Sequence, residues 1–143
     1  MFFLVFWQTM LSQWNVLPKD PVTGETFDSV WIVMNKFDVD AEEAGGDYVK
    51  VYDGGTTSAA LLQTWDSAEN IANDYKVYDL EETEFIKSTG NSVVIQFATD
   101  TTGQADGFEL LYKGVSCPLS VSGEKCGGSA QGSCVKGMCE CTR

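Results

Sequence analysis

The sequence predicts an all-β protein built from short strands, with a small cysteine-rich segment at its C-terminal end. Apolar and polar residues alternate over several short runs, and turn-forming residues separate these runs. Alternation with a period of two is typical of half-buried strands, and several such strands with Gly-rich turns favour a sandwich or a barrel. All five cysteines lie between Cys117 and Cys141. We therefore expect an apolar core to hold the first part of the chain and crosslinks to hold the last part.

The N-terminal run from Met1 to Trp7 is entirely apolar, and two interpretations of it remain open. A secretory signal would require an early basic residue and a small-residue cleavage site. The first basic residue is Lys19, and no such site is evident, so a buried first strand is the favoured interpretation. The run is also far shorter than the roughly 20 residues that a membrane-spanning helix needs.

Four runs after the N-terminus predict the strands of the core, and the first of them has a break in its pattern. Residues 47–54 alternate and end in a turn at Gly54 and Gly55, and residues 93–97 and 108–112 alternate in the same way. From these runs we expect buried side chains at Val49, Val51, Ile95, Phe97, Phe108 and Leu110, with Tyr112 on the face of the last two. The earlier run shifts phase at Asn35 and Lys36, so its inward residues are Val30, Ile32, Met34, Phe37 and Val39.

The stretch from residue 65 to residue 84 differs from these runs because it carries seven acids against a single lysine, Lys76. Such charge runs are usually solvated. We expect a long exposed loop, with at most one helical turn.

The formal net charge of −12, from 21 acids and nine basic residues, limits the function classes. Nucleic-acid binding and adhesion to anionic membranes both need a basic surface, which is missing. The chain also has no histidine, which removes the commonest general base and every His-based zinc site. We expect a protein that is not an enzyme, with partners that carry positive charge: a metal ion, or Lys and Arg side chains of another protein.

Two long segments together resemble the CUB domain, a jelly-roll β-sandwich of extracellular proteins. Residues 37–54 are similar to its strand, acidic loop and "DYV.VYDG" hairpin, and residues 88–112 are similar to its "StGn.l.i.F.tD" and "GF.l.Y" ending. The resemblance covers residues 12–115. The positions of the family's usual cysteines hold Ser12, Ala44 and Trp65, so this sandwich would lack the crosslinks common in the family.

The resemblance also implies a calcium site. Many CUB domains bind calcium through three acidic positions, which correspond here to Asp40, Asp47 and Asp100, with Thr102 close to the last. Calcium prefers six to eight oxygen ligands, so carboxylates from adjoining loops suit it. Asp40 replaces the usual Glu and is shorter. The alternative is an acidic cluster without a bound ion.

The C-terminal segment, residues 117–143, resembles the beginning of an EGF-like module. The spacing of Cys117, Cys126, Cys134, Cys139 and Cys141 matches that family's first five cysteines. The family's pairing implies disulfides Cys117–Cys134 and Cys126–Cys139, and leaves Cys141 without a partner. Clustered cysteines could alternatively bind zinc. A CUB domain followed by an EGF-like module resembles attractin-like and multiple-EGF-domain surface proteins, and the odd cysteine count suggests a fragment of such a chain.

Three functional hypotheses follow. The leading one is an extracellular module, secreted or part of a surface protein, that binds basic groups of a protein partner through acidic loops, with or without calcium. Any membrane association would come from another part of the parent chain. The second is glycan binding, with Tyr48, Tyr52 or Trp65 stacking on sugar rings. The third is a non-catalytic targeting region of a secreted multidomain protease.

Overall fold

A computed structural model describes residues 11–39, 46–66, 71–73, 75–76, 80–100 and 106–142. Within these ranges the chain forms antiparallel strands and one short 3-10 helix, which confirms the all-β prediction. The elements are β1 (Leu11–Val16), β2 (Ser29–Asp38), β3 (Tyr48–Asp53), β4 (Ala60–Asp66), β5 (Ile71–Ala72), η1 (Glu82–Glu84), β6 (Ile86–Lys87), β7 (Val93–Ala98), β8 (Gly107–Val115), β9 (Gly132–Val135) and β10 (Met138–Cys141).

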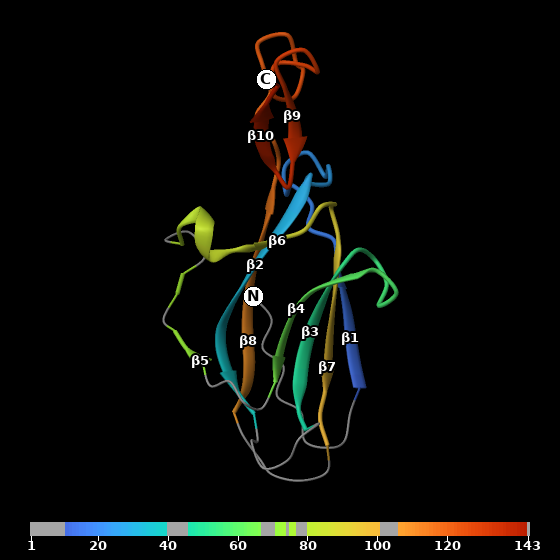
Figure 1. Cartoon of the computed structure of the whole chain (residues 1–143), viewed down its shortest axis with the longest axis vertical. Helices are drawn as coiled ribbons and strands as arrows, with labels where there is room; N and C mark the ends of the chain where they lie inside the picture. Colours follow the sequence, from blue (N-terminus) through green and yellow to red (C-terminus); the bar gives the residue numbers. More distant parts are fainter. Residues whose placement is uncertain are drawn as a thin grey trace.

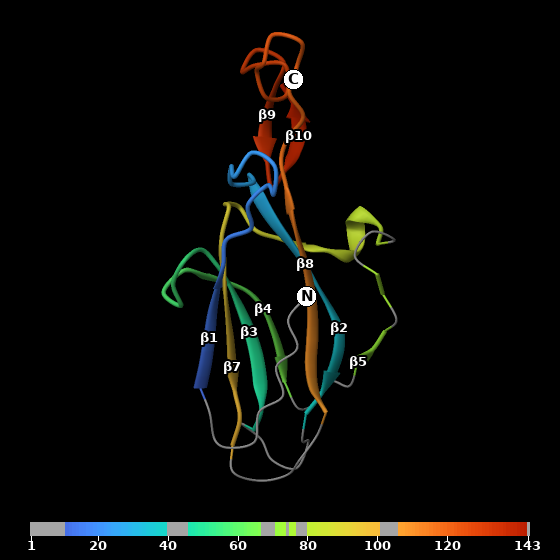
Figure 2. The ribbon, with the colours of Figure 1, turned by 180° about the vertical axis from the view of Figure 1, so that it is seen from behind.

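The strands form two sheets and a separate hairpin (Figures 1 and 2). In the first sheet the order is β1-β7-β3-β4, and in the second β2 pairs with β8 and with the short strands β5 and β6. The β9–β10 hairpin lies beyond one end of the sandwich, next to the start of β2 and the end of β8. Among the described residues there is no helix with the length and apolar character needed to cross a bilayer.

The core forms where the inward faces of the two sheets meet. In the first sheet, the register places Phe97 opposite Val49 and Ile95 opposite Val51, so four of the predicted core residues share one face. All four are buried, as expected. They pack with the inward residues of β2 in one continuous apolar cluster.

Strand β2 shows the predicted shift of phase. Its register with β8 slips between Met34 and Lys36, which marks a β-bulge at Asn35. The five inward residues predicted for this run are Val30, Ile32, Met34, Phe37 and Val39, and all of them are buried. The bulge adds one residue to the strand and so shifts the alternation by one position. As a result Phe37 and Val39, and not Lys36 and Asp38, face the core.

The outer face of β2 is also buried, which the sequence analysis did not predict. Trp31 and Val33 form a second apolar cluster with Phe85, and Tyr75 and Leu80 pack against it. The acidic stretch therefore does not form a simple exposed loop: β5 pairs with β2, and the Tyr75 amide donates to the Asn35 side chain at 2.8 Å. The stretch contains one short helical turn, η1, within the limit of one turn set by the prediction. An apolar outer face has to be covered, and part of this stretch covers it.

Phe108 and Leu110 are only half-buried, so the expectation that they are buried was wrong in degree. They pack against the core cluster on one side, and on the other they line an open hollow of about 540 Å³. Trp14, Ile95 and Tyr112 also line this hollow. It lies between β1 and β8, and among the described strands β1 pairs only with β7 and β8 only with β2. A strand at the margin of a sheet has a paired strand on one side only, so its side chains are covered less completely than those of a central strand.

Several predicted features lie outside the described residues. They are the apolar run from Met1 to Trp7, the proposed ligand Asp40 and the nearby Thr102. The interpretations given above for these residues stay predictions.

Candidate functional site

The structure brings two of the three predicted calcium ligands together. Asp47 directly precedes β3, and Asp100 follows the end of β7 by two residues. The antiparallel register places Tyr48 opposite Ala98, so the start of β3 meets the end of β7. Across this junction the Asp100 amide donates to Asp47 Oδ1 at 2.9 Å. Two loops that are distant in sequence thus present their carboxyl-bearing residues side by side.

The chemistry of this pair fits a hard cation. Asp47 and Asp100 are both half-buried and both offer carboxylate oxygens, the ligand type that calcium prefers. A carboxylate has about four lone-pair sites, so an amide hydrogen bond and metal coordination are compatible at one group. Both residues thus offer ligand atoms of the right kind, and the third predicted ligand, Asp40, lies outside the described residues.

Further acids, which were not among the predicted ligands, lie at the same end of the sandwich. Figures 1 and 2 show that β2, β4 and β7 end there and that β3 and β8 begin there. This end, the acidic end, carries Asp38, Asp47, Asp66, Asp100 and Asp106. For Asp38, Asp47, Asp100 and Asp106 a signal was available, because each lies near the end of a predicted strand. Asp66 ends β4, a strand that was not predicted.

One lysine of this chain lies at the acidic end and pairs with one of its acids. Lys36 Nζ forms a salt bridge with Asp106 at 2.8 Å. This hydrogen bond is the main cause that raises the pKa of Lys36, with further Coulombic support from Asp106, Asp38 and Glu109. The same hydrogen bond lowers the pKa of Asp106. Both groups are well exposed, so the pair contributes little to stability.

The aromatic residues considered for glycan binding do not form an exposed stacking surface. Trp65 is only 5% exposed and belongs to the core, so it was wrongly assigned as a sugar contact. Tyr48 and Tyr52 are half-buried. Lys50 Nζ lies 4.4 Å from the centre of the Tyr48 ring, and the Tyr52 hydroxyl is hydrogen-bonded to Gln96 at 3.2 Å.

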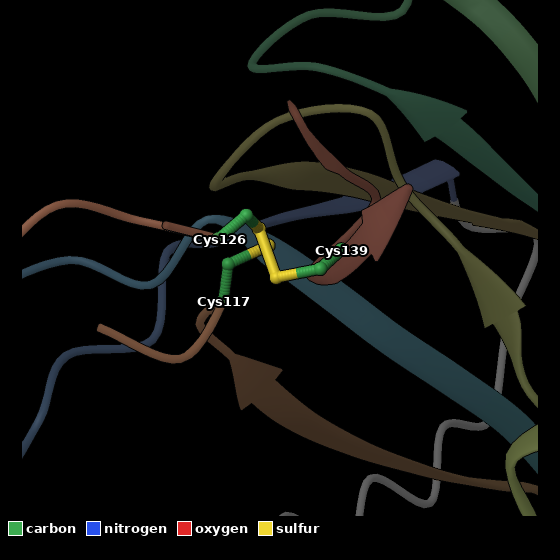
Figure 3. Close-up of side chains that lie close together, drawn as sticks. All are labelled: Cys117, Cys126 and Cys139. Atoms are coloured by element: carbon green, nitrogen blue, oxygen red, sulfur yellow. A yellow bond between two sulfur atoms is a disulfide. The ribbon is translucent and has the colours of Figure 1, made fainter. Parts of the chain in front are cut away.

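The cysteine cluster is a crosslinked structure. Figure 3 shows Cys126 and Cys139 joined by a disulfide, with Cys117 beside them. Cys117 is bonded to Cys134, so the structure contains the two pairs that the EGF-like resemblance implies. Cys141 is free and exposed. Since zinc binds thiolates, the four bonded sulfurs are not suitable ligands in this state.

A search of curated proteins gave no match. Among solved structures, the CUB1-EGF-CUB2 region of human MASP-1/3 aligns with a TM-score of 0.51 and 18% identity over 95% of this chain. The alignment covers 46% of that chain, so the present chain spans less than half of it. A crystal structure described as the MASP-1 CUB2 domain bound to Ca2+ aligns with a TM-score of 0.44 and 18% identity, over 74% of this chain and 79% of that one.

The profile of one family, described as the CUB domain, matches residues 22–112, well over half of the chain. The likeness to the human CUB1-EGF-CUB2 structure agrees with this assignment at the level of the fold. The matched residues include β2 to β7 and most of β8, and they contain the Asp47–Asp100 junction. The chain therefore belongs to the CUB domain family.

Proposed function

We propose that this chain is an extracellular protein-interaction module whose acidic end binds calcium and then a basic group of a protein partner. CUB domains are extracellular protein-interaction modules and are generally non-catalytic. The observation that carries the calcium part of the proposal is the hydrogen bond from the Asp100 amide to the Asp47 carboxylate, because it fixes two acidic loops at one place.

Calcium has a clear physical role at such a junction. Carboxylates held close together repel one another in a chain of net charge −12. A divalent cation offsets this repulsion and orders the loops that supply its ligands. Asp47 and Asp100 would bind the ion, together with Asp40 from the preceding acidic loop. When bound, calcium supplies a fixed positive charge that holds these carboxylates in one arrangement.

A Lys or Arg side chain of a partner is the natural ligand of the acidic end. The salt bridge between Lys36 and Asp106 is a contact of this type within the chain and supports the proposal. Complementary charge mainly sets specificity and association rate, so binding should weaken as ionic strength rises. Glycan binding has less support, because Trp65 is buried.

Thermal unfolding with and without calcium tests the metal site. Calcium at tenfold its Kd should stabilise the fold by about 1.4 kcal/mol, since only the native state binds it. For a chain of this size we expect a rise in Tm of about 3–8 °C. Asp47→Asn should abolish most of this rise. Asparagine keeps an oxygen that can accept the Asp100 amide, so the variant removes the charge and leaves that hydrogen bond available.

The matched control is Glu140→Gln, which removes one negative charge from exposed β10 in the C-terminal hairpin. It should keep the full response to calcium. Millimolar calcium that leaves the wild-type Tm unchanged would refute the metal site. An equal loss of response in both variants would show that calcium acts through net charge alone. Binding of a lysine-rich protein that is the same in Asp47→Asn as in the wild type would refute the acidic end as the partner surface.

A further inference from the structure

The tip of the β9–β10 hairpin sits tightly against the sandwich. Its two turn residues, Lys136 and Gly137, both have positive φ, at 51° and 78°. A two-residue turn of this kind suits the twist of a hairpin. A Cβ at Gly137 would lie 2.9 Å from Val115 Cγ1 and 3.3 Å from Ser29 Cβ. Glycine is therefore required both by the backbone and by the close approach to β8 and β2.

The residues on either side of this glycine reach the outer cluster of the sandwich. The Trp31 indole donates from Nε1 to the Lys136 carbonyl at 2.9 Å. Met138 packs against the cluster of Trp31, Val33 and Phe85, and its sulfur accepts from Lys87 Nζ at 3.4 Å. The same ammonium lies 4.4 Å from the centre of the Trp31 ring, where it makes a cation–π contact.

A second group of contacts ties the base of the C-terminal segment to the sandwich. The Asp28 carboxylate, just before β2, accepts the Cys117 amide at 2.9 Å and also pairs with Lys125. Partial burial acts against the charge of Asp28, but these hydrogen bonds outweigh it and lower its pKa. Cys117 itself is buried, and it is bonded to Cys134, which lies in β9.

We infer that the hairpin tip is a docking element that makes the sandwich and the disulfide-bonded segment one rigid unit. The sandwich has no cysteine of its own before Cys117. Its outer apolar cluster is closed by Met138 and by the hairpin tip, whose shape the Cys126–Cys139 disulfide maintains. The crosslinks of the C-terminal segment thereby stabilise strands that they do not touch covalently. This docking occupies one end of the sandwich, opposite the acidic end.

The test compares two glycine substitutions by hydrogen exchange of the full, oxidised chain. Gly137→Ala and Gly123→Ala both place a side chain at a positive φ, 78° and 83°. They differ in their surroundings, because a Cβ at Gly123 meets nothing within 4 Å. The backbone strain is thus shared, and only Gly137→Ala adds a clash with the sandwich.

We expect Gly137→Ala to speed amide hydrogen exchange about tenfold or more in the first half of β2 and the second half of β8. The added methyl group overpacks the contact and displaces the hairpin tip from the sandwich. Gly123→Ala should change exchange only near its own turn. Equal exchange in β2 and β8 for the two variants would overturn the inference. Should Gly137→Ala fail to fold, Trp31→Phe decides the question, since it removes the indole N–H and keeps a ring. Faster exchange across β9 and β10 in that variant supports docking, and unchanged exchange there refutes it.

Discussion

Replacing Phe97 with alanine tests the assignment of the core most directly. Phe97 is 6% exposed, lies opposite Val49 in the register, and belongs to the main apolar cluster. Its ring centre is 5.0 Å from that of Phe108. Deleting a buried phenylalanine ring loses its transfer free energy and leaves a cavity, which together cost about 3–5 kcal/mol. That is a large part of the roughly 5–15 kcal/mol that holds a typical domain folded.

Urea unfolding followed by tryptophan fluorescence measures this loss. With a typical m value of about 2 kcal/mol/M, the midpoint should fall by about 1.5–2.5 M with no change in m. The corresponding fall in Tm is about 10–20 °C. The buried tryptophans Trp31 and Trp65 report on the outer and inner clusters respectively.

Phe108→Ala is the comparison variant because it also removes a phenylalanine ring and breaks the same Phe97–Phe108 contact, together with a contact to Trp14. Phe108 is half-buried and lines the open hollow, so part of its surface already meets solvent. We expect it to cost about half as much as Phe97→Ala, in proportion to the apolar area it buries. A cost for Phe108→Ala equal to or above that for Phe97→Ala would refute this placement of the core. A negligible cost for Phe97→Ala would refute the sandwich assignment.

Two further predictions concern the C-terminal segment. Peptide mapping of the unreduced protein should recover Cys117 linked to Cys134 and Cys126 linked to Cys139, while Cys141 reacts with an alkylating reagent; a different pairing would contradict the structure. Because the folded state lowers the pKa of Asp28 below 3.8, its charge stabilises the fold above about pH 4, and this stabilisation is lost as pH falls through the lowered value. Asp28→Asn should therefore lower the free energy of unfolding more at pH 7 than at pH 3, and an equal effect at both pH values would show that its charge is unimportant.

The strands could be predicted because their signal is local. Each inward residue of β3 and β7 follows from alternation within its own run, and even the bulge at Asn35 left a visible shift of phase. The half-burial of Phe108 could not be predicted in this way. It depends on β8 lying at a sheet margin beside the hollow, which is a matter of strand order and not of alternation.

In the candidate site, too, some features could be predicted from the sequence and others depend on how the strands pair. Asp47 and Asp100 were identified through family motifs, and their meeting follows from the antiparallel pairing of β3 with β7. Trp65 was misplaced because its environment depends on a partner strand. The register sets it opposite Val49, and opposite residues of paired strands share a face, so Trp65 points into the core. The sequence around Trp65, rich in acids, indicated solvent instead.

The two ends of the sandwich are held by different forces, and this difference follows from the distribution of charge and cysteine. At the acidic end, five aspartates bring like charges together, and the contacts there include the hydrogen bond from the Asp100 amide to Asp47 and the exposed salt bridge between Lys36 and Asp106. At the other end, the fold is held by a buried indole hydrogen bond, a glycine contact and two disulfides. Salt and calcium should act on the first end, where charge interactions are exposed to solvent, and hardly on the second. On the two proposals made above, we therefore expect changes in salt and calcium to alter the acidic end and to leave the docked hairpin unchanged.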